Sequence, residues 1–145
     1  MSYCVHFLLG LLSWVTITTA LSSSVPKAVD LATDFQKYGL TPTQQGDRGD
    51  CSLFAVTALV EFELAKNSPG EVRRLSEEFL IWAAHAASLT KAGDQAMFYE
   101  AVHGLNVFGI CTAKLMPYTK TGQSRHRPSS EAMADAKALR QNKLT

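Results

Sequence analysis

Apolar residues recur at helical spacing in several stretches of the chain, each bounded by residues that begin or end helices. The longest stretch runs from about Asp50 to Lys66 and carries apolar side chains on nearly every face. A helix with this pattern is buried at the centre of a core. The segment Asn67-Ser68-Pro69-Gly70 ends it.

Three further helices follow from the same pattern. One begins after Ser76 as N-cap, has two glutamates in its first turn and runs to about Ser88. The next spans about Gln95 to Phe108 and ends at Gly109; it carries Met97, Phe98, Ala101, Val102 and Leu105 at helical spacing. The last begins after Ser129 or Ser130 and runs to about Gln141. Residues 29–40 predict a short strand or a short helix.

The N-terminal 20 residues form a separate segment. Residues 7–17 are mostly apolar but too short to span a bilayer comfortably, and they end at Thr18-Thr19-Ala20, small residues that a signal peptidase accepts. We expect a cleaved signal peptide over 1–20, a linker and mature start over 21–28, and a secreted or exported protein with no membrane partner after cleavage. An uncleaved anchor or a buried apolar N-terminus are the alternatives.

The composition of the chain limits the classes of function that it can have. The chain has 145 residues, 46% of them hydrophobic, which suffices for one globular domain. Fourteen basic and thirteen acidic side chains give no net field, so nothing indicates a nucleic-acid partner. The spacing of cysteines and histidines matches no metal motif, and we expect no cofactor. The oligomeric state does not follow from the sequence.

Chemistry concentrates in the polar, glycine-containing stretch that precedes the longest helix. Asp50 stands at the N-cap position, so Cys51 lies in the first turn, where the helix terminus and the adjacent Arg48 favour a thiolate. The backbone N–H of Cys51 and the amide of Gln45 suit an oxyanion. A polarised cysteine beside such donors predicts acyl transfer. The alternative is that Cys51 is only a small buried hydrophobic residue.

This stretch resembles the active-site segment of the papain-like cysteine peptidases. The matching residues are Gln45-Gly46-x-x-Gly49-x-Cys51-x-x-Phe54-Ala55, with Glu61 further along the helix. Three other segments resemble the family in the family's order: Val25-Pro26-x-x-Val29-Asp30-Leu31, Leu75-Ser76-Glu77-Glu78-x-Leu80, and Gly109-Ile110 to Met116-Pro117-Tyr118. From roughly Val25 to Tyr118 the chain is therefore similar to the N-terminal half of a divergent, bacterial-type member.

The resemblance implies an α+β papain-like fold. Residues 29–145 would supply its mainly α-helical half, around a central buried helix starting at Cys51. It also implies a cysteine-type peptidase (a thiol protease) that hydrolyses peptide or protein substrates through a thioester on Cys51, with Gln45 and the Cys51 N–H as oxyanion hole.

The family also needs a histidine and an asparagine about 130–150 residues after the cysteine. This 145-residue chain has 94 residues after Cys51. We therefore expect a truncated domain that lacks the β-rich half and is inactive by itself. The alternative from another class is a secreted, non-catalytic papain-like remnant that acts as a binding protein.

The chain departs from the family at informative positions. The commonest signature is Cys-Gly-Ser/Ala-Cys-Trp/Tyr, whereas Arg48 occupies the first cysteine position here. The usual disulfide partner falls at Ala83, so both ends of that bridge are absent together. The glycine-rich loop that helps line the substrate cleft reads Gly93-Asp94-Gln95-Ala96, which leaves specificity open.

The remaining candidates have structural interpretations. We expect His85 and His103 to be surface or core-edge residues inside helices and His126 to be a solvated loop residue. Cys111 is expected to be a half-buried free thiol, with a disulfide to Cys51 as the alternative. The tripeptide 48–50 reads Arg-Gly-Asp, an adhesion ligand when displayed on an exposed loop, but its position against the active-site helix argues against display.

Overall fold

The computed structural model describes residue 28 and residues 30–71, 73–89, 95–120 and 126–143. This part contains five α-helices: α1 (Ala32–Lys37), α2 (Cys51–Asn67), α3 (Glu77–Ser88), α4 (Phe98–Phe108) and α5 (Ser130–Lys143). Each helix expected from the sequence is present. The predicted signal peptide (1–20) and all but the last residue of the 21–28 linker lie outside the described residues.

The first residues of α3 and α4 show how hydrogen bonds near a helix N-terminus determine where the helix begins. The N-cap prediction at Ser76 is confirmed, because its hydroxyl accepts the N–H of Phe79 at 2.9 Å. By contrast, α4 begins at Phe98, three residues later than predicted. Gln95 has a φ of 72°, which is incompatible with a right-handed helix, and the Glu100 carboxylate accepts the N–H of Met97 at 2.8 Å.

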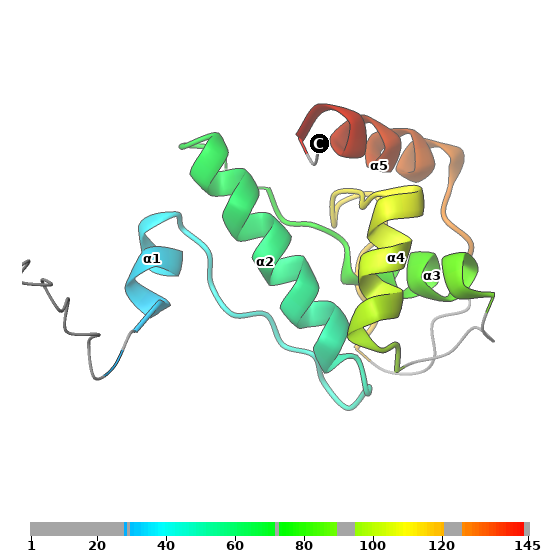
Figure 1. Ribbon diagram of the computed structural model, residues 1–145, viewed down its shortest axis with the longest axis horizontal. Helices are drawn as coiled ribbons and strands as arrows, with labels where there is room; N and C mark the ends of the chain where they lie inside the picture. The colour runs from blue at the N-terminus through cyan, green and yellow to red at the C-terminus, as the bar shows by residue number, and fades with distance from the viewer. Residues whose placement is uncertain (1–27, 29, 72, 90–94, 121–125, 144–145) are drawn as a thin grey trace, which may run out of the picture.

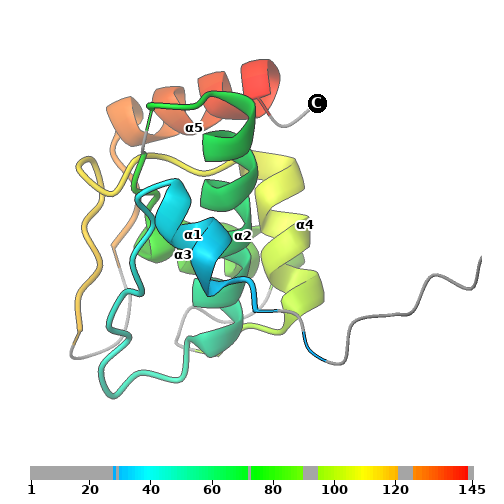
Figure 2. The same cartoon turned by 90° about the vertical axis from the view of Figure 1, so that its left-hand side faces the viewer.

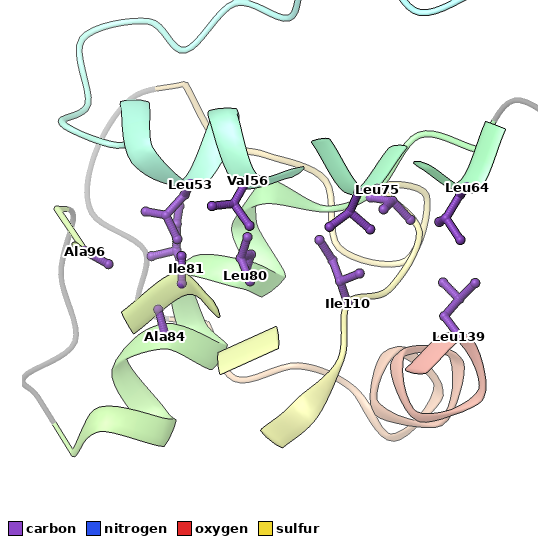
Figure 3. Packing of buried hydrophobic residues seen from close by; sticks show 12 residues of the cluster. Leu53, Val56, Leu64, Leu75, Leu80, Ile81, Ala84, Ala96, Ile110 and Leu139 are labelled. Atoms are coloured by element: carbon purple, nitrogen blue, oxygen red, sulfur yellow. The ribbon is translucent and has the colours of Figure 1, made fainter. Parts of the chain in front are cut away.

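Helix α2 is the axis of the structure (Figure 1). Helix α1 lies on one side of it, and α3, α4 and α5 lie on the other (Figures 1 and 2). The ring of Phe35 in α1 stacks on Phe62 of α2 at 4.7 Å between centroids. The core lies on the opposite side, where Leu53, Val56 and Leu64 of α2 point toward α3 and α5 (Figure 3).

The prediction that α2 is buried on nearly every face is wrong. Cys51, Ala55 and Leu59 recur at intervals of four residues and are exposed, Leu59 at 59%. These residues define an exposed stripe along α2 that starts at the candidate nucleophile. The apolar composition of α2 therefore exceeds what the described residues bury.

The closest helix contact joins α3 and α4 at Gly104. A Cβ built on Gly104 would lie 2.5 Å from the backbone nitrogen of Ala84 and 2.6 Å from the carbonyl carbon of Ala83. Only glycine allows the two backbones to approach so closely. This contact positions the start of α4, and with it residues 95–97, beside the N-terminus of α2.

The described residues form no strand; they show one isolated antiparallel bridge, between Leu75 and Thr112. This agrees with the expectation of a mainly helical half-domain. None of the described helices has the length and apolar character needed to cross a membrane.

Candidate functional site

The loop that leads into α2 is held by contacts to distant segments. Gly46 has a φ of 71°, and a Cβ there would lie 2.9 Å from the carbonyl oxygen of Lys120. The hydroxyl of Tyr118 donates to the carbonyl oxygen of Gln45 at 2.9 Å and to the Asp50 carboxylate at 3.1 Å. The loop is thus fixed from the 118–120 segment, far away in sequence.

Gln45 and Cys51 are brought to the two ends of this loop. The half-buried Gln45 side chain donates through Nε2 to the carbonyl oxygen of Arg48. Cys51 is a free, exposed thiol and the first residue of α2. No carbonyl of the same helix can accept its backbone N–H, since the first N–H groups of a helix lack intrahelical partners.

Asp50 occupies the N-cap position as predicted, but its carboxylate makes no cap hydrogen bond. The carboxylate instead accepts the N–H of Gln95 at 3.2 Å and the Tyr118 hydroxyl, and lies 3.1 Å from Nε of Arg48. Its backbone carbonyl accepts the N–H groups of Leu53 and Phe54. Asp50 therefore begins the helix with its backbone and ties it to two other segments with its side chain.

Arg48 is a buried cation, with 5% of its surface exposed. Its NH1 lies 2.7 Å from a Glu78 carboxylate oxygen and 2.6 Å from the carbonyl oxygen of Thr119, and its guanidinium lies 4.7 Å above the Tyr118 ring. Two carboxylates neutralise this charge, so Arg48 does not supply the net positive charge beside Cys51 that the sequence suggested. Because Asp50 is fully buried as well, the Arg-Gly-Asp tripeptide is not displayed for adhesion.

Sequence reasoning missed the roles of Glu78 and Tyr118. The two carboxylates and the buried guanidinium form a cluster that the Tyr118 ring covers. Burial and the neighbouring Asp50 carboxylate raise the pKa of Tyr118, so its hydroxyl remains a donor at neutral pH. Arg48 itself was the available signal, since an arginine that becomes buried needs buried partners of opposite charge.

Several apolar side chains at the start of α4 are exposed. Met97, Phe98, Tyr99 and Val102 are exposed, by 64%, 59%, 69% and 47%. Of the residues that recur at helical spacing along this stretch, Met97, Phe98 and Val102 therefore lie outside the core, whereas Ala101 is fully buried. The segment contacts α2 where the hydroxyl of Ser52 donates to the carbonyl oxygen of Ala96.

The glycine-rich loop predicted to line the cleft is described only at its last two residues. Gln95 is exposed, and its side chain lies against Gly49, where a Cβ would come within 2.5 Å of it. Residues 93 and 94 lie outside the described residues. The part that is described thus places an amide side chain next to the loop that carries Cys51.

The other titratable candidates have structural surroundings. His85 is buried near the end of α3, a deeper position than predicted, whereas His103 and His126 are exposed. Cys111 is fully buried rather than half-buried, and it is a free thiol rather than a disulfide partner of Cys51. Burial raises the pKa of the Cys111 thiol to about 12. Within the described ranges, no group of three or more His, Cys, Asp or Glu side chains is arranged to hold a metal ion.

No family model matches the sequence, and no curated protein matches it. In three dimensions, however, the arrangement of helices is that of part of a cysteine protease fold. A similar solved structure is that of xylellain, a cysteine protease from Xylella fastidiosa, with a TM-score of 0.57 and 19% sequence identity. The similarity covers 79% of this chain and 53% of xylellain, so the chain spans about half the length of that protein.

Proposed function

We propose that this chain carries the nucleophile of a cysteine-type peptidase, with Cys51 as the attacking residue. The observation that supports this most directly is an exposed free thiol at the first residue of the central helix, in a chain whose fold is similar to that of a cysteine protease. A thiol in this position benefits from the positive end of the helix dipole. The substrate class is a peptide or protein, as for a protease.

In the proposed reaction the Cys51 thiolate attacks the carbonyl carbon of the scissile peptide bond. The carbonyl oxygen becomes an oxyanion, which the Cys51 N–H and the Gln45 amide stabilise. An amide nitrogen carries two hydrogens; one binds the Arg48 carbonyl and fixes the side chain, and the second remains for the substrate. The C–N bond then breaks, the protonated amine leaves, and water hydrolyses the thioester.

The general acid–base is proposed to come from a histidine in the half of the catalytic domain that residues 29–145 do not supply. Two observations support this: the chain spans 53% of xylellain, and the described histidines are buried in α3 or exposed on α4 and before α5. We therefore propose that residues 29–145 are the helical half of the catalytic domain and are inactive alone.

We also propose residues 1–20 as an export signal, which N-terminal sequencing of secreted protein would test.

A peptide-library assay tests the proposed function. The chain and its Cys51→Ala variant are compared with any longer reading frame of the same gene and the same variant of that frame. We expect cleavage only from the longer product, and its loss in Cys51→Ala. Gln45→Ala should lower kcat about 10²–10³-fold, the effect of removing one oxyanion donor. Cleavage that persists in Cys51→Ala would refute the proposal.

A further inference from the structure

A pocket of about 330 Å³ lies between α1, the 40–43 segment and the middle of α2. It is separate from the candidate nucleophile, since neither Cys51 nor Gln45 is among the described residues that line it. Its apolar wall consists of Ala32, Phe35, Leu40, Pro42 and Ala58. The volume falls within the range of small-molecule sites, which are mostly apolar with a few convergent polar groups.

The polar wall of this pocket is acidic. Its charged lining residues are Glu61, Glu77 and Arg74, so two carboxylates face one guanidinium. Glu61 and Glu77 are both buried, with exposures of 4% and 6%. Arg74 lies 3.0 Å from the Glu61 carboxylate and also donates to the Thr41 carbonyl oxygen at 3.3 Å. The charges sum to one uncompensated negative charge.

The two carboxylates differ in how well they are satisfied. Glu61 accepts the N–H of Leu75 at 2.7 Å and pairs with Arg74. Glu77 accepts a hydrogen bond from its own backbone N–H and a long one from the hydroxyl of Thr43 at 3.4 Å, and it interacts with Arg74 without a direct ion pair. Glu77 is therefore the carboxylate with capacity for a further donor.

We propose that this pocket binds a small organic cation, a primary ammonium ion with an aliphatic body, with the ammonium group on Glu77 and the body against the Phe35 and Leu40 wall. An ammonium ion supplies three donors and the missing positive charge. A charge-assisted hydrogen bond of this kind is about twice as strong as a neutral one. The apolar wall is removed from water by an aliphatic chain but would not be covered by a hydrated metal ion.

The electrostatics of the free pocket agree with this assignment. Burial raises the pKa of both Glu61 and Glu77, and Arg74 only partly offsets this. The Glu77 carboxylate raises the pKa of Glu61 further, and the neighbouring Glu78 carboxylate raises that of Glu77. A bound ammonium ion would relieve this repulsion. Neutral molecules of the same shape would leave it unchanged.

Binding is tested on the full chain by titrating n-hexylamine at pH 7.5 and following backbone amide NMR shifts. The matched probes are n-hexanol, which keeps the chain but not the charge, and hexanoate, which reverses the charge. We expect saturable shifts of pocket residues, with hexylamine bound about tenfold more tightly than hexanol and hexanoate not bound.

Three variants complete the test. Glu77→Gln should weaken hexylamine about tenfold and leave hexanol unchanged. Ala58→Leu should abolish binding of both by filling the pocket. Glu63→Gln, an exposed carboxylate on the same helix that pairs with Lys66, should change nothing. Equal affinity for hexylamine and hexanol, hexylamine binding that survives Ala58→Leu, or the absence of saturable shifts would each overturn the proposal. Circular dichroism verifies that each variant is folded, and Ala58→Leu decides the question if Glu77→Gln is not.

Discussion

Removing the Arg48 guanidinium should destabilise the protein more than removing any exposed charge. The change Arg48→Met keeps most of the side-chain length but deletes the cation between Asp50 and Glu78, whose side chains are 0% and 2% exposed. Asp50 would retain the Gln95 N–H and the Tyr118 hydroxyl. Glu78 would retain the Thr119 N–H at 3.3 Å, and its Oε1 has no hydrogen-bond partner in the described part of the chain.

The expected loss of unfolding free energy arises because buried carboxylates are left without their cation. Deleting one partner of a buried ion pair costs about 3–5 kcal/mol, because the remaining charge stays desolvated. With an m-value of about 2 kcal/mol per molar urea, a loss of 4 kcal/mol lowers the urea midpoint by about 2 M. Urea unfolding followed by far-UV circular dichroism measures this shift directly.

Two controls separate the buried pair from a general effect of charge. Lys66→Met removes an exposed cation whose partner is Glu63, and it should cost less than about 1 kcal/mol. Combining Arg48→Met with Glu78→Gln removes one of the two stranded charges, so the double variant should be more stable than Arg48→Met alone. A free energy of unfolding within about 1 kcal/mol of the wild type for Arg48→Met would refute the assignment of this cluster as a structural anchor.

Three further outcomes are expected. Iodoacetamide should modify Cys51 before Cys111 near neutral pH, because Cys51 is exposed whereas Cys111 is buried and burial raises the pKa of its thiol to about 12; these two thiols should react alike in urea. Gly104→Ala should cost about 3 kcal/mol or more through its clash with the α3 backbone, measured by urea unfolding against the neutral exposed substitution Asn106→Ala. The wild type should lose free energy of unfolding, relative to Glu77→Gln, as the pH rises from 4.5 through the raised pKa of Glu77. The reason is that the folded wild type then has to deprotonate a buried carboxyl group. A difference in unfolding free energy between the two proteins that does not change with pH would contradict this.

The sequence predicted the helices because local signals determine them. Ser76 is an N-cap by its own hydroxyl, Gly109 ends α4, and Ser129 accepts the N–H of Ala132 at the start of α5. Such signals act over three or four residues and can be recognised without knowing the rest of the fold. The error at the start of α4 arose where a distant carboxylate, Asp50, binds the Gln95 N–H in a non-helical conformation.

Burial was predicted less well than secondary structure. Apolar spacing identified the inward face of α2 correctly at Leu53 and Val56, but it could not show that Leu59 remains exposed. The same holds for Met97 and Phe98 at the start of α4. Periodicity shows which side chains share a face of a helix, whereas the number of faces that are covered depends on neighbours that the helix itself does not encode.

The position of Cys51 was predicted by the sequence, but the means of holding it there was not. In the resemblance to papain-like peptidases, a disulfide would join the positions of Arg48 and Ala83, linking the nucleophile loop to the second helix. Here Arg48 makes that link through an ion pair with Glu78 of α3 instead. Such a bond needs no oxidation to form, but it depends on a buried carboxylate remaining charged. We therefore expect reductants to leave the loop before Cys51 in place and loss of the Glu78 charge to displace it. Charge, and not redox state, then controls the geometry of the proposed nucleophile.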